Sequence, residues 1–223
     1  MARFGLYVFD AYGTLFDVHS AVARHAAALG PAAQRLSELW RVKQLEYTWT
    51  RSLMGSWRDF RACTADALDF AAARCEVALS PKLRSDLLAA YERLDAFADA
   101  APALDALKRA GAKTAILSNG TDAMLASATE AAGLAPHLDA VLSIDACSIF
   151  KTAPATYALV GAQFDVAPAE VSFQSSNRWD VAGARRFGFR TTWVNRGGMP
   201  DEYTDLPPDL NVRTLDELVQ KDV

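Results

Sequence analysis

Polar residues that could carry chemistry stand directly after short apolar runs in this sequence. Asp10 follows the run Gly5–Phe9, and Ser118 with Asn119 follows Thr114–Leu117. An aspartate at the end of a buried strand is often only a turn residue. In a cleft, however, its carboxylate can attack an electrophilic carbon and leave an ester that water then opens. This spacing therefore raises the possibility of covalent catalysis.

A lysine and a second polar stretch strengthen that interpretation. Lys151 lies beyond the apolar run Ala140–Ile144, and polar residues follow the run Val171–Phe173. A lysine facing Asp10 would favour the ionised form of its carboxyl group, which the nucleophile requires. The alternative for Lys151 is an ordinary solvated side chain.

The hydroxyl and amide residues also have a structural alternative. Ser118 and Asn119 could cap a helix that begins near Asp122. Residues 175–177 precede Asp180 at a spacing typical of a capping box. Capping and a role in a binding site can coexist, because donors at a helix N-terminus favour anions.

The pattern of the elements indicates an α/β fold with an insertion. Apolar residues recur at helical spacing from about Ser20 to Phe97, and no strand pattern interrupts them. Strand and helix patterns then alternate. The predicted strands are Thr114–Leu117, Ala140–Ile144, Val171–Phe173 and Thr191–Val194, and the predicted helices are Pro102–Ala110, Asp122–Ala132, Pro154–Gln163 and Val181–Phe187.

Such alternation predicts a Rossmann-like parallel sheet. We expect residues 1–16 and 98–223 to form this core domain, and residues 17–97 to form a helical cap domain inserted after the first strand. Ligands bind beyond the carboxyl ends of parallel strands. The polar residues named above should therefore meet at one site.

The composition argues against several classes of protein. The 223 residues carry a formal net charge of −4, which leaves no basic surplus for nucleic acid or an anionic membrane surface. Cys63, Cys75 and Cys147 are too few and too widely spaced for a disulfide framework or a metal cluster. The apolar run Phe4–Phe9 is too short for a signal peptide. We expect a cytoplasmic protein whose partner is a small-molecule substrate.

Four motifs in order resemble those of the haloacid dehalogenase superfamily, and most closely those of the L-2-haloacid dehalogenases. Two segments of the predicted cap are also similar to that family, so that the resemblance spans nearly the whole chain. The motifs are Phe9–Phe16, Leu117–Gly120, Lys151 and Ser175–Asp180, and the cap segments are Arg41–Tyr47 and Arg51–Met54.

The resemblance implies an (S)-2-haloacid dehalogenase that converts short L-2-haloalkanoic acids to D-2-hydroxy acids without a metal or cofactor, as a homodimer. Asp10 would be the nucleophile, and Asp180 would activate water or fix Lys151. The implied catalytic residues are Asp10, Lys151, Asp180, Ser175, Asn177 and Thr14. The implied substrate-binding residues are Ser118, Asn119, Arg41, Tyr12, Leu45, Phe60, Tyr157 and Trp179.

Two rival functions remain open at this stage. A magnesium-dependent phosphatase of the same superfamily would carry a second aspartate where this chain has Tyr12. Two unit charges 4 Å apart repel by about 4 kcal/mol at an effective dielectric near 20, and a phosphate dianion roughly doubles that, so phosphoryl transfer needs a metal. A non-catalytic binding protein on this scaffold is the other rival.

Hydrolases that use a histidine-activated serine or cysteine lack support, because none of the three histidines falls at a predicted strand end.

Four positions differ from the pattern of the resembled family, and they put substrate size and halide preference in doubt rather than the reaction. They are Val42, Thr152, Gln174 and Arg178. Val42 is expected to widen or dry the pocket, and Arg178 to change the charge at its mouth.

Overall fold

Six strands form one parallel sheet in the computed structural model, which describes residues 1–223. The strand order is β3-β2-β1-β4-β5-β6. The strands are β1 (Leu6–Phe9), β2 (Lys113–Ser118), β3 (Ala140–Ser143), β4 (Val171–Ser175), β5 (Arg190–Val194) and β6 (Leu210–Val212). Because β1 lies between β2 and β4, the loop that follows β1 starts at the middle of the sheet edge.

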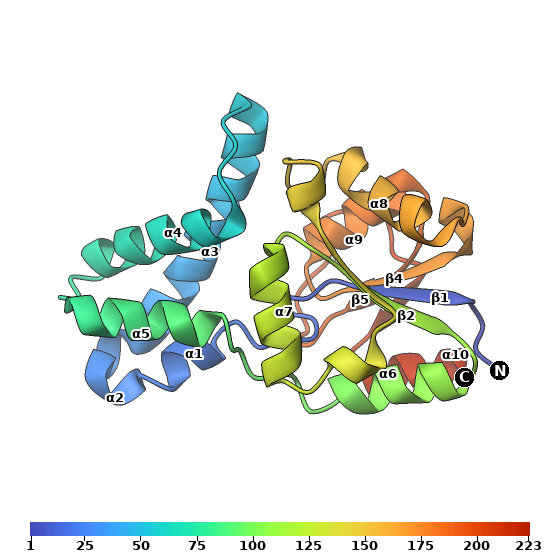
Figure 1. Ribbon diagram of the computed structural model, residues 1–223, viewed down its shortest axis with the longest axis horizontal. Helices are drawn as coiled ribbons and strands as arrows, with labels where there is room; N and C mark the ends of the chain where they lie inside the picture. The colour runs from blue at the N-terminus through green and yellow to red at the C-terminus, as the bar shows by residue number, and fades with distance from the viewer.

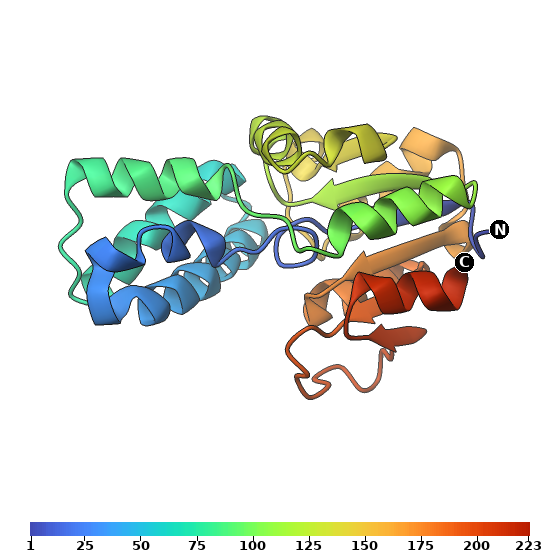
Figure 2. The same cartoon turned by 90° about the horizontal axis from the view of Figure 1, so that it is seen from below.

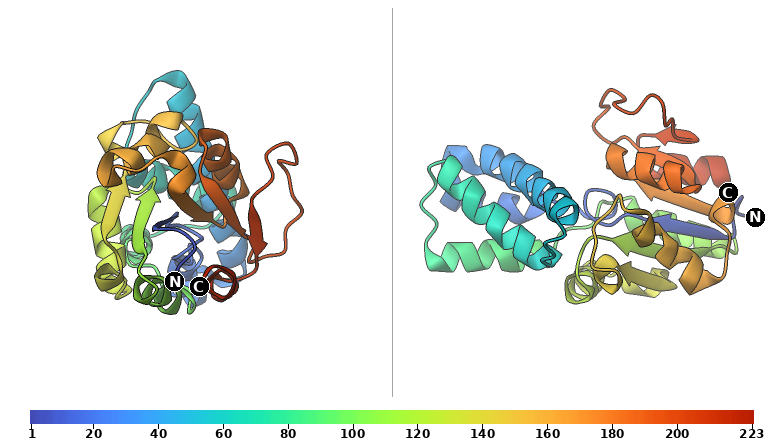
Figure 3. Two further views of the ribbon diagram at one scale, coloured as in Figure 1. Left: turned by 90° about the vertical axis from the view of Figure 1, so that its right-hand side faces the viewer. Right: turned by 90° about the horizontal axis from the view of Figure 1, so that it is seen from above.

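Helices cover both faces of this sheet. They are α6 (Ala100–Arg109), α7 (Asp122–Ala131), α8 (Pro154–Phe164), α9 (Arg178–Phe187) and α10 (Leu215–Asp222). Helices α6 and α10 pack together on one face, and α8 and α9 pack together on the other (Figure 3). Strand β1 is fully buried between them, which explains its unbroken apolar sequence.

The remaining helices form a separate bundle beside the sheet (Figure 1). They are α1 (Ser20–Ala23), α2 (Ala26–Leu29), α3 (Ala33–Met54), α4 (Phe60–Arg74) and α5 (Pro81–Tyr91). We call these residues, 20–91, the helical unit. Two chain segments join it to the sheet (Figure 2). They are hydrogen-bonded to each other, since the Asp17 amide donates to the Asp95 carbonyl over 2.8 Å and the Phe97 amide donates to the Leu15 carbonyl over 2.9 Å.

Local sequence signals set the ends of the helices in this unit. Helix α3 stops at Gly55, which adopts the left-handed conformation that suits glycine (φ 65°). The side chains of Asp59 and Ser80 cap α4 and α5 by accepting from backbone amides, and Pro81 occupies the first turn of α5.

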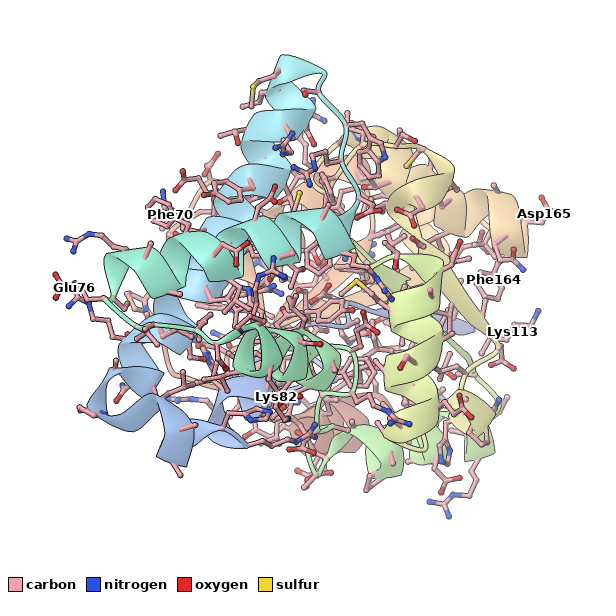
Figure 4. The ribbon with its side chains drawn as sticks, turned by 60° about the vertical axis from the view of Figure 1, so that its left-hand side comes forward. Phe70, Glu76, Lys82, Lys113, Phe164 and Asp165 are labelled. Carbon is pink, nitrogen blue, oxygen red and sulfur yellow. The ribbon has the colours of Figure 1, made fainter.

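The apolar core is continuous between the sheet and the helical unit. The ring of Tyr12, in the loop after β1, lies 5.2 Å from that of Phe60 on α4 and stacks on Tyr91 of α5 at 5.7 Å. The outer ends of α4 and α8, at Glu76 and Asp165, lie on opposite sides of the molecule (Figure 4). Because the loop after β1 contacts α4 and α5, residues of both parts can take part in one ligand site.

The predicted fold class is confirmed, whereas several element boundaries are wrong. Helix α9 begins at Arg178, three residues before the predicted start, and α6 begins at Ala100, so that Pro102 is its third residue. The last helix of the helical unit ends at Tyr91 rather than near Phe97. A proline or an apolar residue marks a favourable position inside the first turn, but the helix can start earlier because its first amides need no intrahelical partner.

Three short elements depart from the predicted pattern. Strand β3 ends at Ser143, because Ile144 begins one of four 3₁₀ turns. Strand β6 and helix α10 were not predicted. A three-residue edge strand such as β6 has too few residues for a visible period. The 3₁₀ turns are Gly30–Ala32, Ala135–His137, Ile144–Ala146 and Pro168–Glu170. None of the helices combines the length and hydrophobicity required to cross a bilayer.

Candidate active site

The Asp10 carboxylate lies just beyond β1 and accepts hydrogen bonds from three side chains. The Lys151 ammonium donates to Oδ1 over 3.2 Å, while Thr14 and the Asn177 amide donate to Oδ2 over 3.0 and 2.8 Å. Only 6% of the Asp10 side chain is exposed. Three donors, one of them a cation, fit the ionised carboxylate, which accepts hydrogen bonds and donates none.

The turn after β1 is held against the turn after β4 by a closed set of hydrogen bonds. The Ser176 amide donates to the Thr14 hydroxyl oxygen over 2.8 Å, and the Ser176 hydroxyl donates to the Gly13 carbonyl over 2.5 Å. Gly13 has φ +93°, a conformation that side chains rarely tolerate. These contacts fix the Thr14 hydroxyl so that its own hydrogen points to Asp10.

Lys151 is a completely buried cation that lies between two carboxylates. Its ammonium group is 3.2 Å from Asp10 Oδ1 and 2.8 Å from Asp180 Oδ2, and none of its side chain is exposed. Burial alone would lower the pKa of Lys151, but the two carboxylates outweigh it and the pKa is raised. Its backbone amide donates to Asn119 over 3.0 Å, which fixes the start of this segment.

Asp180 lies in the first turn of α9 and is fully buried. Burial raises its pKa to about 6, because the ionised form loses its hydration; Lys151 opposes this and the charge of Asp10 adds to it. The Tyr157 hydroxyl donates to Asp180 Oδ1 over 2.8 Å. Tyr157 does not line the cavity described below, and its hydroxyl group contacts Asp180.

A small cavity opens beside Asp10, between the sheet edge and the helical unit. All nine residues that line it are among those predicted from the sequence. They are Asp10, Tyr12, Arg41, Leu45, Phe60, Ser118, Asn119, Asn177 and Trp179. The other five predicted residues lie outside its lining: Lys151, Asp180, Ser175, Thr14 and Tyr157.

Polar groups occupy two parts of the cavity wall. Arg41 reaches in from α3, where its guanidinium donates to the Asn177 side-chain oxygen over 3.2 Å and to the Tyr12 carbonyl over 3.1 Å. Ser118 and Asn119 come from the end of β2. A cation and a hydroxyl–amide pair in one cavity can bind two anionic groups of one ligand.

The rest of the wall is apolar and aromatic. Phe60 is almost fully buried against Tyr12, and Trp179 packs edge-on against Trp49 of α3 at 5.3 Å. Leu45 completes this part of the lining. Apolar walls exclude most water molecules from a cavity, and electrostatic interactions inside it are therefore stronger than in bulk water.

Helix capping does not explain the predicted polar residues. The cap of α7 is Thr121, not Ser118 or Asn119. Asn177 occupies the N-cap position of α9 but makes no side-chain capping bond, because its side-chain oxygen accepts from Arg41 and its side-chain nitrogen donates to Asp10. The Ser175 hydroxyl oxygen accepts from the Asn177 backbone amide over 3.1 Å, which shapes the turn that presents Asn177.

The positions that differ from the pattern of the resembled family lie away from the cavity. The Val42 side chain is 57% exposed and does not line it, so the expected widening or drying of the pocket is wrong. Arg178 is buried and points away, where it pairs with Asp201 at 2.6 Å; the expected change of charge at the mouth is therefore also wrong.

The other two differences are also remote from the lining. Gln174 is buried within the sheet, where its side-chain amide bonds to the Ser172 hydroxyl over 2.6 Å. Thr152 borders a separate surface groove. Its methyl group lies close to Gly183, at which a Cβ atom would come within 2.8 Å. This glycine lets α9 approach the segment that follows Lys151.

Three residues of the site network were not predicted: Gln44, Thr64 and Tyr91. Gln44 accepts from the second nitrogen of the Arg41 guanidinium over 2.9 Å. Thr64 and Tyr91 appear in the sequence only as residues of a helical stretch. Gln44 lies in the segment Arg41–Tyr47 that resembles the family, and this was the signal that could have drawn attention to it.

The arrangement does not fit a resident divalent metal ion. No group of three or more His, Cys, Asp or Glu side chains converges on one point. The two carboxylates of the site, Asp10 and Asp180, are both bonded to Lys151. An ammonium group already neutralises the charge that a metal would otherwise balance.

Comparison with known proteins supplies a family. The sequence profile of the haloacid dehalogenase-like hydrolases matches residues 4–188. The chain is 47% identical over 213 residues to (S)-2-haloacid dehalogenase 1 of Pseudomonas sp. (strain CBS-3), covering 96% of this chain and 94% of that protein. It is 48% identical over 211 residues to (S)-2-haloacid dehalogenase 4A of Burkholderia cepacia, covering 95% and 91%.

Solved structures agree over almost the whole chain. The L-2-haloacid dehalogenase of Xanthobacter autotrophicus with chloropropionic acid covalently bound superposes with a TM-score of 0.88 at 37% identity, covering 97% of each chain. A crystal structure of another dehalogenase superposes with a TM-score of 0.96 at 46% identity, covering 99% of this chain and 98% of that one.

We expect the Asp180 carboxyl group to titrate near pH 6, well above its ordinary value of 3.8. Because burial favours the neutral form, the folded protein holds this proton at pH values where the unfolded chain has lost it. The contribution of Asp180 to stability is therefore largest below about pH 4 and is lost as the pH rises through about 6. Carbon-13 NMR of aspartate-labelled protein measures the midpoint.

Two variants make this titration interpretable. Asp180→Asn should remove the resonance and so assign it. Asp10→Asn should move the midpoint to lower pH, because it removes a negative charge that raises the pKa of Asp180. A midpoint for Asp180 below pH 4 would contradict the predicted balance between burial and Lys151.

Proposed function

The chain belongs to the haloacid dehalogenase-like hydrolase family, and on that premise we propose that it hydrolyses short L-2-haloalkanoic acids to D-2-hydroxy acids. Relatives that are 47% and 48% identical over most of the chain are (S)-2-haloacid dehalogenases. The observation that carries the proposal is the Asp10 carboxylate, which borders a cavity with Arg41 in its wall and has Lys151 bonded behind it.

In the first step the Asp10 carboxylate attacks carbon 2 of the substrate. A carbon–oxygen bond forms as the carbon–halogen bond breaks, the halide leaves with the electron pair, and the configuration at carbon 2 inverts. The product of this step is an ester between Asp10 and the substrate. Hydrogen bonds from Thr14 and Asn177 orient the attacking carboxylate before the reaction starts.

Two regions of the cavity bind the two negatively charged parts of the reacting substrate, its carboxylate and the departing halide. Ser118 and Asn119 bind the substrate carboxylate, since hydroxyl and amide groups donate to carboxylate oxygens. Arg41 stabilises the departing halide, where negative charge develops during the step. Phe60 and Trp179 keep that part of the cavity poor in water.

In the second step water attacks the carboxyl carbon of Asp10. The bond between that carbon and the ester oxygen breaks, the oxygen leaves with the product and takes up a proton, and one water oxygen remains on Asp10. We assign acceptance of the water proton to Asp180, whose pKa of about 6 lies close to neutrality. Lys151 balances the charge of whichever carboxylate is ionised.

We also propose that the helical unit acts as a cap domain on a core of residues 1–16 and 98–223. Arg41, Leu45 and Phe60 reach the cavity from α3 and α4, whereas Asp10, Ser118 and Asn177 reach it from the sheet edge. A change in the two connecting segments would open or close the cavity. Closure would exclude water until the ester has formed.

The rival functions have less support. A phosphatase would have to place a phosphate dianion beside Asp10, and the roughly doubled repulsion needs a metal for which three or more converging ligands are lacking. Tyr12 also stands where such an enzyme carries its second aspartate. A binding protein would not need a carboxylate at the cavity wall that accepts from three side chains, one of them a buried lysine.

The first experiment measures halide release from L- and D-2-chloropropionate in the presence of a metal chelator. We expect release from the L form alone, because the relatives that are 47% and 48% identical are (S)-2-haloacid dehalogenases. Asp10→Asn is the matched control, since it keeps the shape of the side chain and removes its nucleophilicity. Phosphate-ester hydrolysis on added magnesium, with no halide release, would support the phosphatase instead.

The ester intermediate has its own test. One turnover in heavy-oxygen water, with enzyme in excess over L-2-chloropropionate, should place the label on Asp10 and leave the first product unlabelled. Mass spectrometry of the peptide that contains Asp10 and of the product measures both. Label in the first product would exclude the ester, because it would mean that water itself attacked carbon 2.

Finally, we propose that the protein is a cytoplasmic homodimer. Large apolar side chains near the end of α3 are exposed, with Leu53 at 88% and Met54 at 66%, and Figure 1 shows this end of α3 projecting beyond the rest of the molecule. Burial of such side chains favours association. Light scattering should give a mass near twice 24.2 kDa, and a mass of 24.2 kDa would contradict the dimer.

A further inference from the structure

The Arg41 guanidinium is held from two sides. Towards the sheet edge it donates to the Tyr12 carbonyl and to Asn177, and within the helical unit it donates to Gln44 Oε1 over 2.9 Å. The first two acceptors belong to the other part of the molecule. Gln44 is therefore the acceptor that holds the guanidinium from within its own unit.

The amide of Gln44 has one possible orientation. The Thr64 hydroxyl donates to the Phe60 carbonyl over 2.6 Å, so its oxygen is left to accept from Gln44 Nε2 over 2.6 Å. The amide nitrogen consequently faces α4, and the amide oxygen faces Arg41. Because a hydroxyl has only one hydrogen to donate, the reversed amide would leave two acceptors facing each other.

Tyr91 completes the set of contacts around the amide oxygen. Its hydroxyl donates to Gln44 Oε1 over 2.9 Å, so that this oxygen accepts one bond from α5 and one from Arg41. A carbonyl oxygen has two lone pairs, and both are used. Gln44 is completely buried, which makes any loss of these bonds costly. Helices α3, α4 and α5 meet at this one side chain.

We propose that Gln44 is a positioning residue for the departure of the halide. It fixes the direction of the Arg41 guanidinium before the substrate binds, so that the side chain need not be ordered during the reaction. This inference rests on the proposed function, in which Arg41 stabilises the leaving halide. Gln44 itself does not line the cavity.

The leaving group supplies a readout that separates positioning from stability. Chloride is a poorer leaving group than bromide, so its departure depends more on stabilisation of the developing charge. A displaced guanidinium should therefore slow reaction of the chloride substrate more than that of the bromide. A variant that is merely less stable lowers both rates by the same factor, because it only lowers the amount of folded enzyme.

The experiment compares kcat/KM for L-2-chloropropionate and L-2-bromopropionate in Gln44→Met, which keeps the side-chain length and removes both polar groups. We expect kcat/KM for the chloride to fall on the order of tenfold, as for loss of one hydrogen bond to a charged group. The chloride-to-bromide ratio should fall by roughly threefold, since only part of that loss persists with the better leaving group.

Three further variants complete the comparison. Gln34→Met makes the same change on the exposed start of the same helix and should leave both rates unchanged. Tyr91→Phe breaks the same buried network but keeps the bond between Gln44 and Arg41, so the ratio should stay near that of the unsubstituted chain. Thr64→Ala removes the acceptor that orients the amide and should lower the ratio less than Gln44→Met, which keeps the inference testable if Gln44→Met does not fold.

Each outcome has a defined meaning. A lower chloride-to-bromide ratio in Gln44→Met and Thr64→Ala, with the ratio retained in Tyr91→Phe, supports the positioning role. Equal losses for both substrates, with normal turnover by the unsubstituted chain, overturn this inference and leave the proposed function intact. No halide release by the unsubstituted chain would instead overturn the proposed function and this inference with it.

Discussion

The buried contact between Lys151 and two carboxylates is the interaction on which the site depends. A completely buried ammonium group is tolerated only when opposing charges and hydrogen bonds replace its hydration, and Asp10 and Asp180 provide both. In turn, the lysine lets two carboxylates lie near each other in an apolar setting. Removal of Lys151 would leave two buried carboxylates without a cation, so the end of β1, the segment before α8 and the first turn of α9 have to meet in one arrangement.

That arrangement also unites the two parts of the molecule. Asn177 donates to Asp10 through its amide nitrogen and accepts from Arg41 through its amide oxygen, so one side chain connects the proposed nucleophile with the proposed halide site. The stack of Tyr12 on Tyr91 makes an apolar contact across the same boundary. Chemistry at Asp10 is thus coupled to the position of the helical unit by a few short contacts.

The positions that differ from the resembled family show why a sequence pattern alone can mislead. Arg178 stands next to site residues in the sequence, yet its side chain points to the opposite side of α9 and binds Asp201. Val42 follows Arg41, yet successive residues of a helix point in different directions, and it faces solvent. A residue that is adjacent to a site residue in the sequence therefore need not line the cavity.

Fold class and the residues at the strand ends could be predicted from the sequence, because strand and helix periods and the ends of parallel strands follow from local pattern. All nine cavity-lining residues could be named from the sequence, most of them through the family resemblance and the others from local pattern. The roles of Gln44, Thr64 and Tyr91 and the place of Tyr157 behind Asp180 became visible only in the folded chain. These depend on hydrogen bonds between elements distant in sequence, and local periodicity holds no information about which side chains meet there.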